Sequence, residues 1–185
     1  MPNKSLQPTA TPRLSSGVAP KRMNRLAFAI AAVSLLVIGV ASATQKADLV
    51  RVKKSDSTLR LLNKGVEFAS FHVAFGANPN GHKEAEGDER TPEGRYVLDY
   101  KKDDSSFYKA IHISYPNDAD RARAVQLGVK PGGAIMVHGQ KNGMAWLAPL
   151  AQYFNWTNGC IALRNEEMDL VWEAVDAGTP IEIEP

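Results

Sequence analysis

Short runs in which apolar and polar residues alternate recur along the chain after about residue 48. In Ile111-His112-Ile113-Ser114, for example, every second side chain is apolar, a period that is typical of a half-buried β-strand. Between the second and third runs, Asn63-Lys64-Gly65 has the residue types of a hairpin turn. The pattern predicts strands at 49–53, 58–62, 66–74, 94–100, 110–114, 134–138 and 180–184.

Two segments have helical features instead. Residues 117–127 begin with Asn117 as an N-cap, carry acidic residues in the first turn and end at Gly128. Residues 165–177 repeat this design, with Asn165 expected to cap the helix and Gly178 to end it. In the second helix an apolar stripe recurs at helical spacing and is interpreted as a core face: Met168, Val171, Trp172 and Val175. The fold class expected is a β-rich α+β domain with a few packed helices.

One long segment, residues 76–94, has neither period and contains four glycines and many charges. Loops of this length in compact domains are commonly functional or mobile. We expect this segment to border a substrate site and to be mobile when no substrate is bound.

The first 43 residues differ from the rest of the chain. Basic residues, ending with Arg25, precede an apolar run at 26–40, and Ala41-Ser42-Ala43 has the small-x-small pattern of a signal-peptidase site. We interpret 1–43 as a signal peptide, with Met23 as an alternative start, and 44–185 as one domain. The protein is therefore expected to be exported to the periplasm or cell envelope, and an uncleaved leader would be its only membrane contact.

Charge is uneven between these two parts. Residues 1–43 contain five basic and no acidic residues, so the other 17 Lys and Arg face all 20 acidic residues, which gives the domain a net charge of −3. Nucleic-acid binding needs a cationic surface. The composition thus argues against a nucleic-acid partner.

The chain has one cysteine, Cys160, which has no intramolecular disulfide partner. A lone cysteine in an exported protein is either a buried apolar residue or a reactive thiol. Gly159 allows a sharp turn before it, and His138, at the end of a predicted strand, is the best candidate for a base. No paired-cysteine or HExxH motif is present, so neither a metal nor another cofactor is expected.

Three ordered elements resemble the catalytic signature of the L,D-transpeptidase catalytic-domain (YkuD-like) family. They are Val137-His138-Gly139, then Thr157-Asn158-Gly159-Cys160 about twenty residues later, and upstream Thr91-Pro92-Glu93-Gly94-Arg95-Tyr96. The resemblance covers most of 46–184 and implies the family's mixed, β-sandwich-like catalytic fold.

By this resemblance Cys160 attacks a carbonyl in a peptidoglycan stem tetrapeptide and His138 is its base. A backbone carbonyl, with Gly139 the candidate, would orient the histidine, and the amides of Gly159 and Cys160 would form an oxyanion hole. The resulting thioester would pass to an amine. Further candidates for substrate binding are Thr157, Asn158, His112, Arg164 and Arg90.

The chain departs from the family pattern at two positions. Asn158 stands where many members have His, and Ala162 where many have Arg or Asn, a charge that Arg164 could replace. These positions bear on the choice of acceptor and do not involve the nucleophile. Two alternatives stay open: a hydrolase that uses the same thioester, and a non-catalytic wall-binding domain in which Cys160 is merely buried.

Overall fold

The computed structural model describes residues 45–185, so the predicted leader lies outside the described residues. The chain forms the strands β1 (Leu49–Lys53), β2 (Thr58–Asn63), β3 (Val66–His72), β4 (Gly94–Lys102), β5 (Ala110–Ile113), β6 (Met136–His138), β7 (Ile161–Ala162) and β8 (Thr179–Glu184). The helices are α1 (Asp118–Leu127), the 3₁₀ turn η1 (Ala145–Leu147), α2 (Ala148–Ala151) and α3 (Asn165–Ala174).

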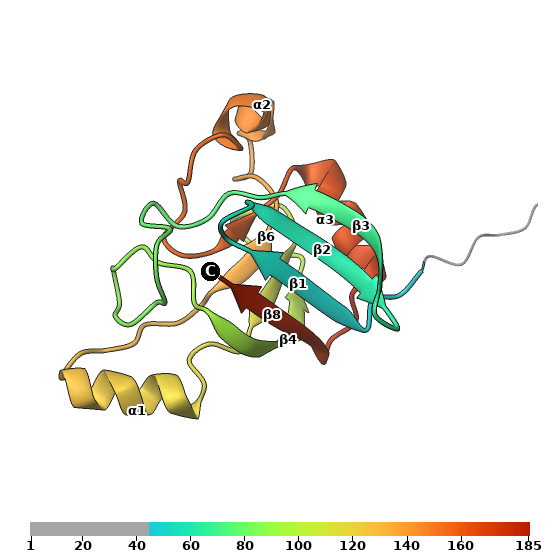
Figure 1. Cartoon of the computed structure of the whole chain (residues 1–185). Coiled ribbons are helices and arrows are strands. Elements are labelled where there is room, and N and C mark those ends of the chain that lie inside the picture. Colours follow the sequence, from blue (N-terminus) through green and yellow to red (C-terminus); the bar gives the residue numbers. More distant parts are fainter. Residues whose placement is uncertain (1–44) are drawn as a thin grey trace, which may run out of the picture. The chain divides into compact units, whose positions relative to one another are not determined.

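The strands form one mixed sheet in the order β3-β2-β1-β8-β4-β5-β6-β7. Only β1 with β8 and β6 with β7 are parallel among the described pairs, and the others are antiparallel. In Figure 1 the sheet curls, so that β4 and β6 lie behind β1, β2 and β8. The β-rich α+β fold expected from the sequence is confirmed, as one curled sheet.

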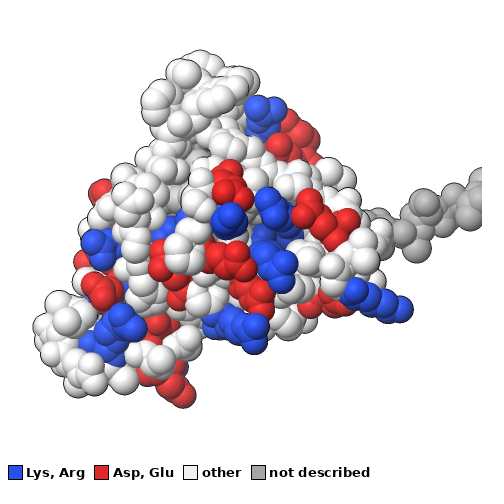
Figure 2. Space-filling view, viewed as in Figure 1, with Lys and Arg blue, Asp and Glu red and all other residues white. Residues whose placement is uncertain are grey.

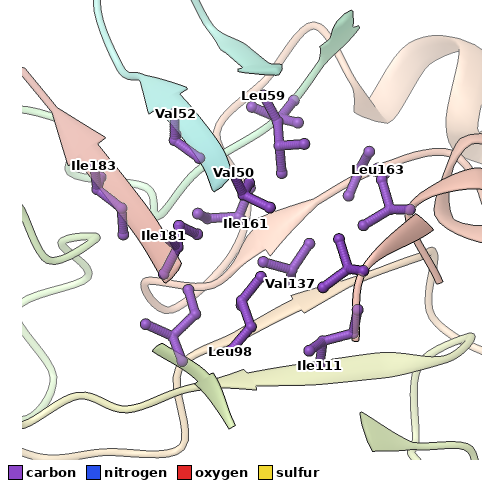
Figure 3. Packing of buried hydrophobic residues seen from close by; sticks show 14 of the residues in the cluster. Val50, Val52, Leu59, Leu98, Ile111, Val137, Ile161, Leu163, Ile181 and Ile183 are labelled. Atoms are coloured by element: carbon purple, nitrogen blue, oxygen red, sulfur yellow. The ribbon is translucent and has the colours of Figure 1, made fainter. Parts of the chain in front are cut away.

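The core lies between the two halves of this curled sheet. In Figure 3, side chains such as Val50 and Ile181 from β1 and β8 point toward Ile111, Val137 and Ile161 from β5, β6 and β7. All five are fully buried. Burying their apolar surface supplies the main favourable term in folding, and it fixes which residues of β6 and β7 face inward.

Local rules of the chain explain the turns and helix ends. Lys64 and Gly65 both have positive φ, of 51° and 78°, as a two-residue hairpin turn requires. Asn117 accepts a hydrogen bond from the Asp120 N–H, and Gly128 ends α1 in the left-handed conformation.

Three sequence expectations need correction. Arg164, rather than Asn165, occupies the N-cap position of α3, and the helix ends at Ala174 instead of 177. The Asn165 side chain is used elsewhere, because it accepts a hydrogen bond from the Gln140 N–H at 2.8 Å. The elements β7, η1 and α2 were not predicted, and the predicted strand at 134–138 is shorter, beginning at Met136.

Candidate active site

Cys160 lies at the edge of the sheet, directly before β7. The parallel pairing aligns Val137 with Ile161 and His138 with Ala162, which brings Cys160 alongside Met136. Because side chains alternate along a strand, Val137 and Ile161 point into the core while Met136 and His138 share the opposite face. The short parallel pair therefore places Cys160 and His138 on one face of the sheet.

The thiol of Cys160 is half-buried and contacts backbone on both sides. Its Sγ accepts a hydrogen bond from the Met136 N–H at 3.4 Å and lies 3.8 Å from the Ala134 carbonyl oxygen. Burial raises the pKa of the Cys160 thiol, while the Met136 N–H and the charge of Lys83 oppose this effect. The thiol is consequently protonated in the resting protein at neutral pH.

His138 is almost fully buried, with 2% of its surface exposed. Its Nδ1 lies 2.6 Å from the Gly139 carbonyl oxygen, so Nδ1 carries the proton that is donated and Nε2 keeps its lone pair. Phe107 and Trp156 pack on the ring, with centroid distances of 4.3 and 5.9 Å. Burial lowers the pKa of His138 to about 4, against the opposing effect of the Gly139 bond, which leaves a neutral imidazole that can accept a proton.

One pocket contains both residues. Its volume is about 290 Å³, and its lining includes Cys160, His138, Phe107, Trp156 and Asn158. A neutral thiol and a neutral imidazole with a free lone pair in the same cavity are the components of base-assisted nucleophilic attack.

Thr157 organises the turn that precedes the cysteine. Its hydroxyl donates to the Cys160 carbonyl at 2.8 Å and accepts from the Gly159 N–H at 3.1 Å. Gly159 has φ of 114°, and a Cβ there would lie 2.5 Å from the Arg90 carbonyl oxygen. Only glycine fits this position, and the Thr157 hydroxyl fixes the backbone at Gly159 and Cys160.

Comparison with known proteins identifies the fold and its family. Residues 47–183 match the YkuD family, described as the L,D-transpeptidase catalytic domain. The chain belongs to the L,D-transpeptidase catalytic-domain family. The resemblance seen in the sequence is thereby confirmed.

The chain is also similar to individual curated and solved proteins. YafK of Escherichia coli (strain K12), provisionally named an L,D-transpeptidase, is 29% identical over 132 residues, which are 68% of this chain and 46% of YafK. The helical cell shape determining protein Pgp2 of Campylobacter jejuni has a TM-score of 0.58 and 26% identity, over 74% of this chain and 46% of Pgp2. Bd1075 of Bdellovibrio bacteriovorus shares the fold, with a TM-score of 0.52 and 21% identity, over 76% and 51% of the two chains. The chain thus spans about half the length of YafK and Pgp2.

Three other predicted residues of this L,D-transpeptidase domain are not in the lining of the Cys160 pocket. His112 stacks on Tyr100 and its Nδ1 lies 2.7 Å from Asp99 Oδ1. Arg164 donates its backbone N–H to Glu167, and the Arg90 guanidinium lies 3.6 Å from Glu84. Substrate contacts by these side chains stay predictions, whereas Asn158 is exposed at the pocket itself.

The domain also contains contacts that sequence reasoning did not identify. Phe107 and Trp156 pack on the catalytic histidine candidate from two segments far apart in the sequence. Trp156 could have been recognised from the sequence, because it lies four residues before Cys160, but no neighbouring motif marks Phe107. Across residues 45–185, no cluster of three or more His, Cys, Asp or Glu could hold a metal ion.

A second unpredicted feature is a lobe formed by residues 141–156, which we call the aromatic lobe. It contains η1 and α2 and exposes five large apolar side chains: Met144, Trp146, Leu150, Tyr153 and Phe154. The region of α2 at the top of Figure 1 is white in Figure 2, because residues 142–163 include no Lys, Arg, Asp or Glu. No helix among residues 45–185 has the length and apolar character needed to cross a membrane.

Proposed function

We propose that this protein is a peptidoglycan L,D-transpeptidase that acts through a thioester on Cys160. The observation that carries the proposal is the single pocket that holds the Cys160 thiol and the His138 imidazole. The imidazole is oriented by a backbone carbonyl, that of Gly139, in place of a carboxylate. Family membership supplies the substrate class, the stem peptides of the cell wall.

In the first half-reaction the Nε2 lone pair of His138 takes the thiol proton as Sγ attacks the carbonyl on the L side of an L-D peptide bond. Burial disfavours the separated ions in the resting state, so proton transfer accompanies attack. The tetrahedral intermediate collapses when His138 returns the proton to the leaving D-amino acid. Backbone amides of Gly159 and Cys160 would hold the oxyanion, which requires the Gly159 N–H to turn from Thr157.

In the second half-reaction the amine of another stem attacks the thioester. His138 then removes the amine proton, and the thiol is restored. Residues 1–43 would act as an export signal that places this chemistry in the periplasm or cell envelope.

Incubation of the purified protein with muropeptides, followed by mass analysis, tests the proposal. Transfer yields cross-linked dimers and free D-amino acid; Cys160→Ser should abolish both products, and His138→Ala should slow their formation strongly. His72→Ala is the matched control, because that ring contacts the Gln152 carbonyl at 3.0 Å outside the pocket. Shortened stems without dimers would establish a hydrolase instead, and no product with a folded protein would contradict catalysis.

A further inference from the structure

Two buried lysines hold the loop at residues 76–94, and each is paired with a carboxylate of the same loop. Lys54 reaches it from the end of β1, with Nζ 2.7 Å from Glu93 Oε1, and its side chain is 4% exposed. Lys83 lies within the loop, with Nζ 2.7 Å from Asp88 Oδ1, and its side chain is 3% exposed. Burying an ammonium is costly unless it is paired, so these pairs call for an explanation.

The Asp88 carboxylate is also the centre of a tight turn. Its Oδ2 accepts the N–H groups of Glu84 and Ala85 at 2.8 and 3.0 Å, and its Oδ1 accepts that of Arg90 at 3.1 Å. Burial would raise the pKa of Asp88, but the Lys83 ammonium and these N–H groups lower it to about 2. The carboxylate is therefore ionised at neutral pH, and the Lys83–Asp88 pair is a true ion pair.

This turn packs against both segments that flank the nucleophile. Beyond Asp88, the Arg90 carbonyl oxygen lies against Gly159, where a Cβ would be only 2.5 Å away. On the other side Glu86 packs on Gly132 and donates its N–H to the Lys130 carbonyl at 2.7 Å. That segment leads to Ala134, whose carbonyl contacts the Cys160 sulfur. The turn that contains the Lys83–Asp88 pair thus contacts both the residue before Cys160 and the segment that leads to Ala134.

We propose that Lys83 is a positioning residue for the transpeptidase reaction, whose buried ammonium, held by Asp88, stabilises the negative charge that develops on Cys160. The inference rests on the proposed function of Cys160 as nucleophile. Lys83 is buried in the turn whose Arg90 carbonyl packs on Gly159, directly before the nucleophile, and its positive charge favours the thiolate against the larger effect of burial. A buried charge acts at a distance because the interior screens it less than water does.

The other ionisable groups around the pair do not replace Lys83. Burial raises the pKa of Tyr115, whose hydroxyl lies 3.4 Å from the Lys83 carbonyl, so its phenol stays neutral. His138 is neutral in the resting state because burial lowers its pKa to about 4. Of the other charged side chains near the turn, Glu84 lies within ion-pair distance of Arg90 and Arg123, and Asp120 of His82. Glu86, Glu89 and Lys130 are exposed, so water screens their charges.

The rate of Cys160 alkylation by iodoacetamide as a function of pH tests this role. Lys83→Met leaves the Asp88 charge unbalanced and should raise the thiol pKa by about one unit, which slows alkylation about tenfold at pH 7. Lys83→Arg keeps the charge and should restore most of the rate. Lys54→Met is the matched control, because it removes the other buried lysine that pairs with a carboxylate of this loop and should leave the thiol pKa unchanged.

Asp88→Asn gives a test with the opposite sign, which also serves if Lys83→Met does not fold. With the ammonium no longer balanced, the thiol pKa should fall and alkylation at pH 7 should be faster than in the wild type. If Lys83 and Asp88 only maintained the structure, Lys83→Met and Asp88→Asn would shift the thiol pKa in the same direction, or Lys54→Met would shift it by the same amount. Either result overturns the inference. A wild-type thiol that stays inert until denaturant is added would instead refute the proposed function.

Discussion

Two irregular segments contact the surroundings of Cys160, and they are held in opposite ways: the loop at residues 76–94 packs on Gly159, and the aromatic lobe contributes Trp156 to the pocket lining. The loop at residues 76–94 is rich in charge, yet it is fixed by buried ion pairs and by backbone contacts to Gly159. The aromatic lobe at 141–156 is rich in apolar side chains, yet it exposes them, with Trp146 and Tyr153 each 76% exposed. From composition alone, the charged loop would be expected to be mobile and the apolar lobe to be buried.

The difference shows that contacts, and not residue type, decide which segment is fixed. In the loop, glycines allow close backbone approach, and short side chains such as Asp88 accept several N–H groups. These contacts argue against the mobility that its glycines and charges led us to expect. In the lobe, the elements are too short to bury their own apolar surface, because α2 has only four residues.

The largest expected effect is on a glycine of the loop. A Cβ at Gly76 would lie 1.9 Å from the Glu89 carbonyl oxygen and 2.9 Å from the Gly159 nitrogen. Gly76→Ala should therefore lower the free energy of unfolding by about 3 kcal/mol, measured by urea denaturation. Gly143→Ala in the lobe is the control: it meets no atom within 4 Å and adds only strain at φ of 81°, about 1 kcal/mol. Equal losses in the two variants would remove the contrast between the segments.

A smaller effect is expected from acid. The pKa of Asp88 is about 2 in the folded protein, below the value near 3.9 of an unfolded chain. Its contribution to stability is thus present above pH 4 and is lost as pH falls through 2. We expect about 1 kcal/mol, reduced by solvent screening of a side chain that is 16% exposed.

The measurement is the free energy of unfolding at several pH values from 5 to 2, in the wild type and in Asp88→Asn. The difference between the two proteins should shrink as pH falls. A difference that stays constant would mean that Asp88 is not held as an anion by Lys83. The titration of His138, in the window between about 6.5 and 4, affects the wild type and Asp88→Asn equally and cancels in the difference between them.

The smallest effect on stability is expected in the lobe. Trp146→Ser removes a large side chain that is already 76% exposed, so the free energy of unfolding should change by less than about 0.5 kcal/mol. Thermal or urea denaturation in parallel with Gly76→Ala provides the comparison. A loss above about 1 kcal/mol would show that Trp146 is covered in solution.

Much of the fold could be predicted because its signals are local. The alternation of β1 is clean and that of β2 holds as far as Leu61, and α1 has its cap and its terminal glycine in the sequence itself. In contrast, β7 has two residues and exists only through its pairing with β6. The lobe has no period to detect, and Asn165 satisfies the usual preference for a cap while its side chain bonds a distant residue, Gln140.

For the site, Cys160 and His138 were visible through their motif and spacing. Lys83 was not, because its importance arises from a turn that packs against Gly159 about seventy residues later in the chain. The same holds for Phe107, whose contact with the His138 ring joins the segment before β5 to the end of β6. Such residues are recognised only once the sheet has brought the segments together.

The most direct test of the central claim is the intact mass of the protein after brief incubation with a stem tetrapeptide and an acid quench. We predict a mass gain equal to the tetrapeptide less its terminal D-amino acid, located on the peptide that contains Cys160 and removed by hydroxylamine, as a thioester requires. Cys160→Ser should show no gain, and His138→Ala should show a slow one. An unmodified wild-type protein that nevertheless releases the D-amino acid, or an adduct on another residue, would contradict the account.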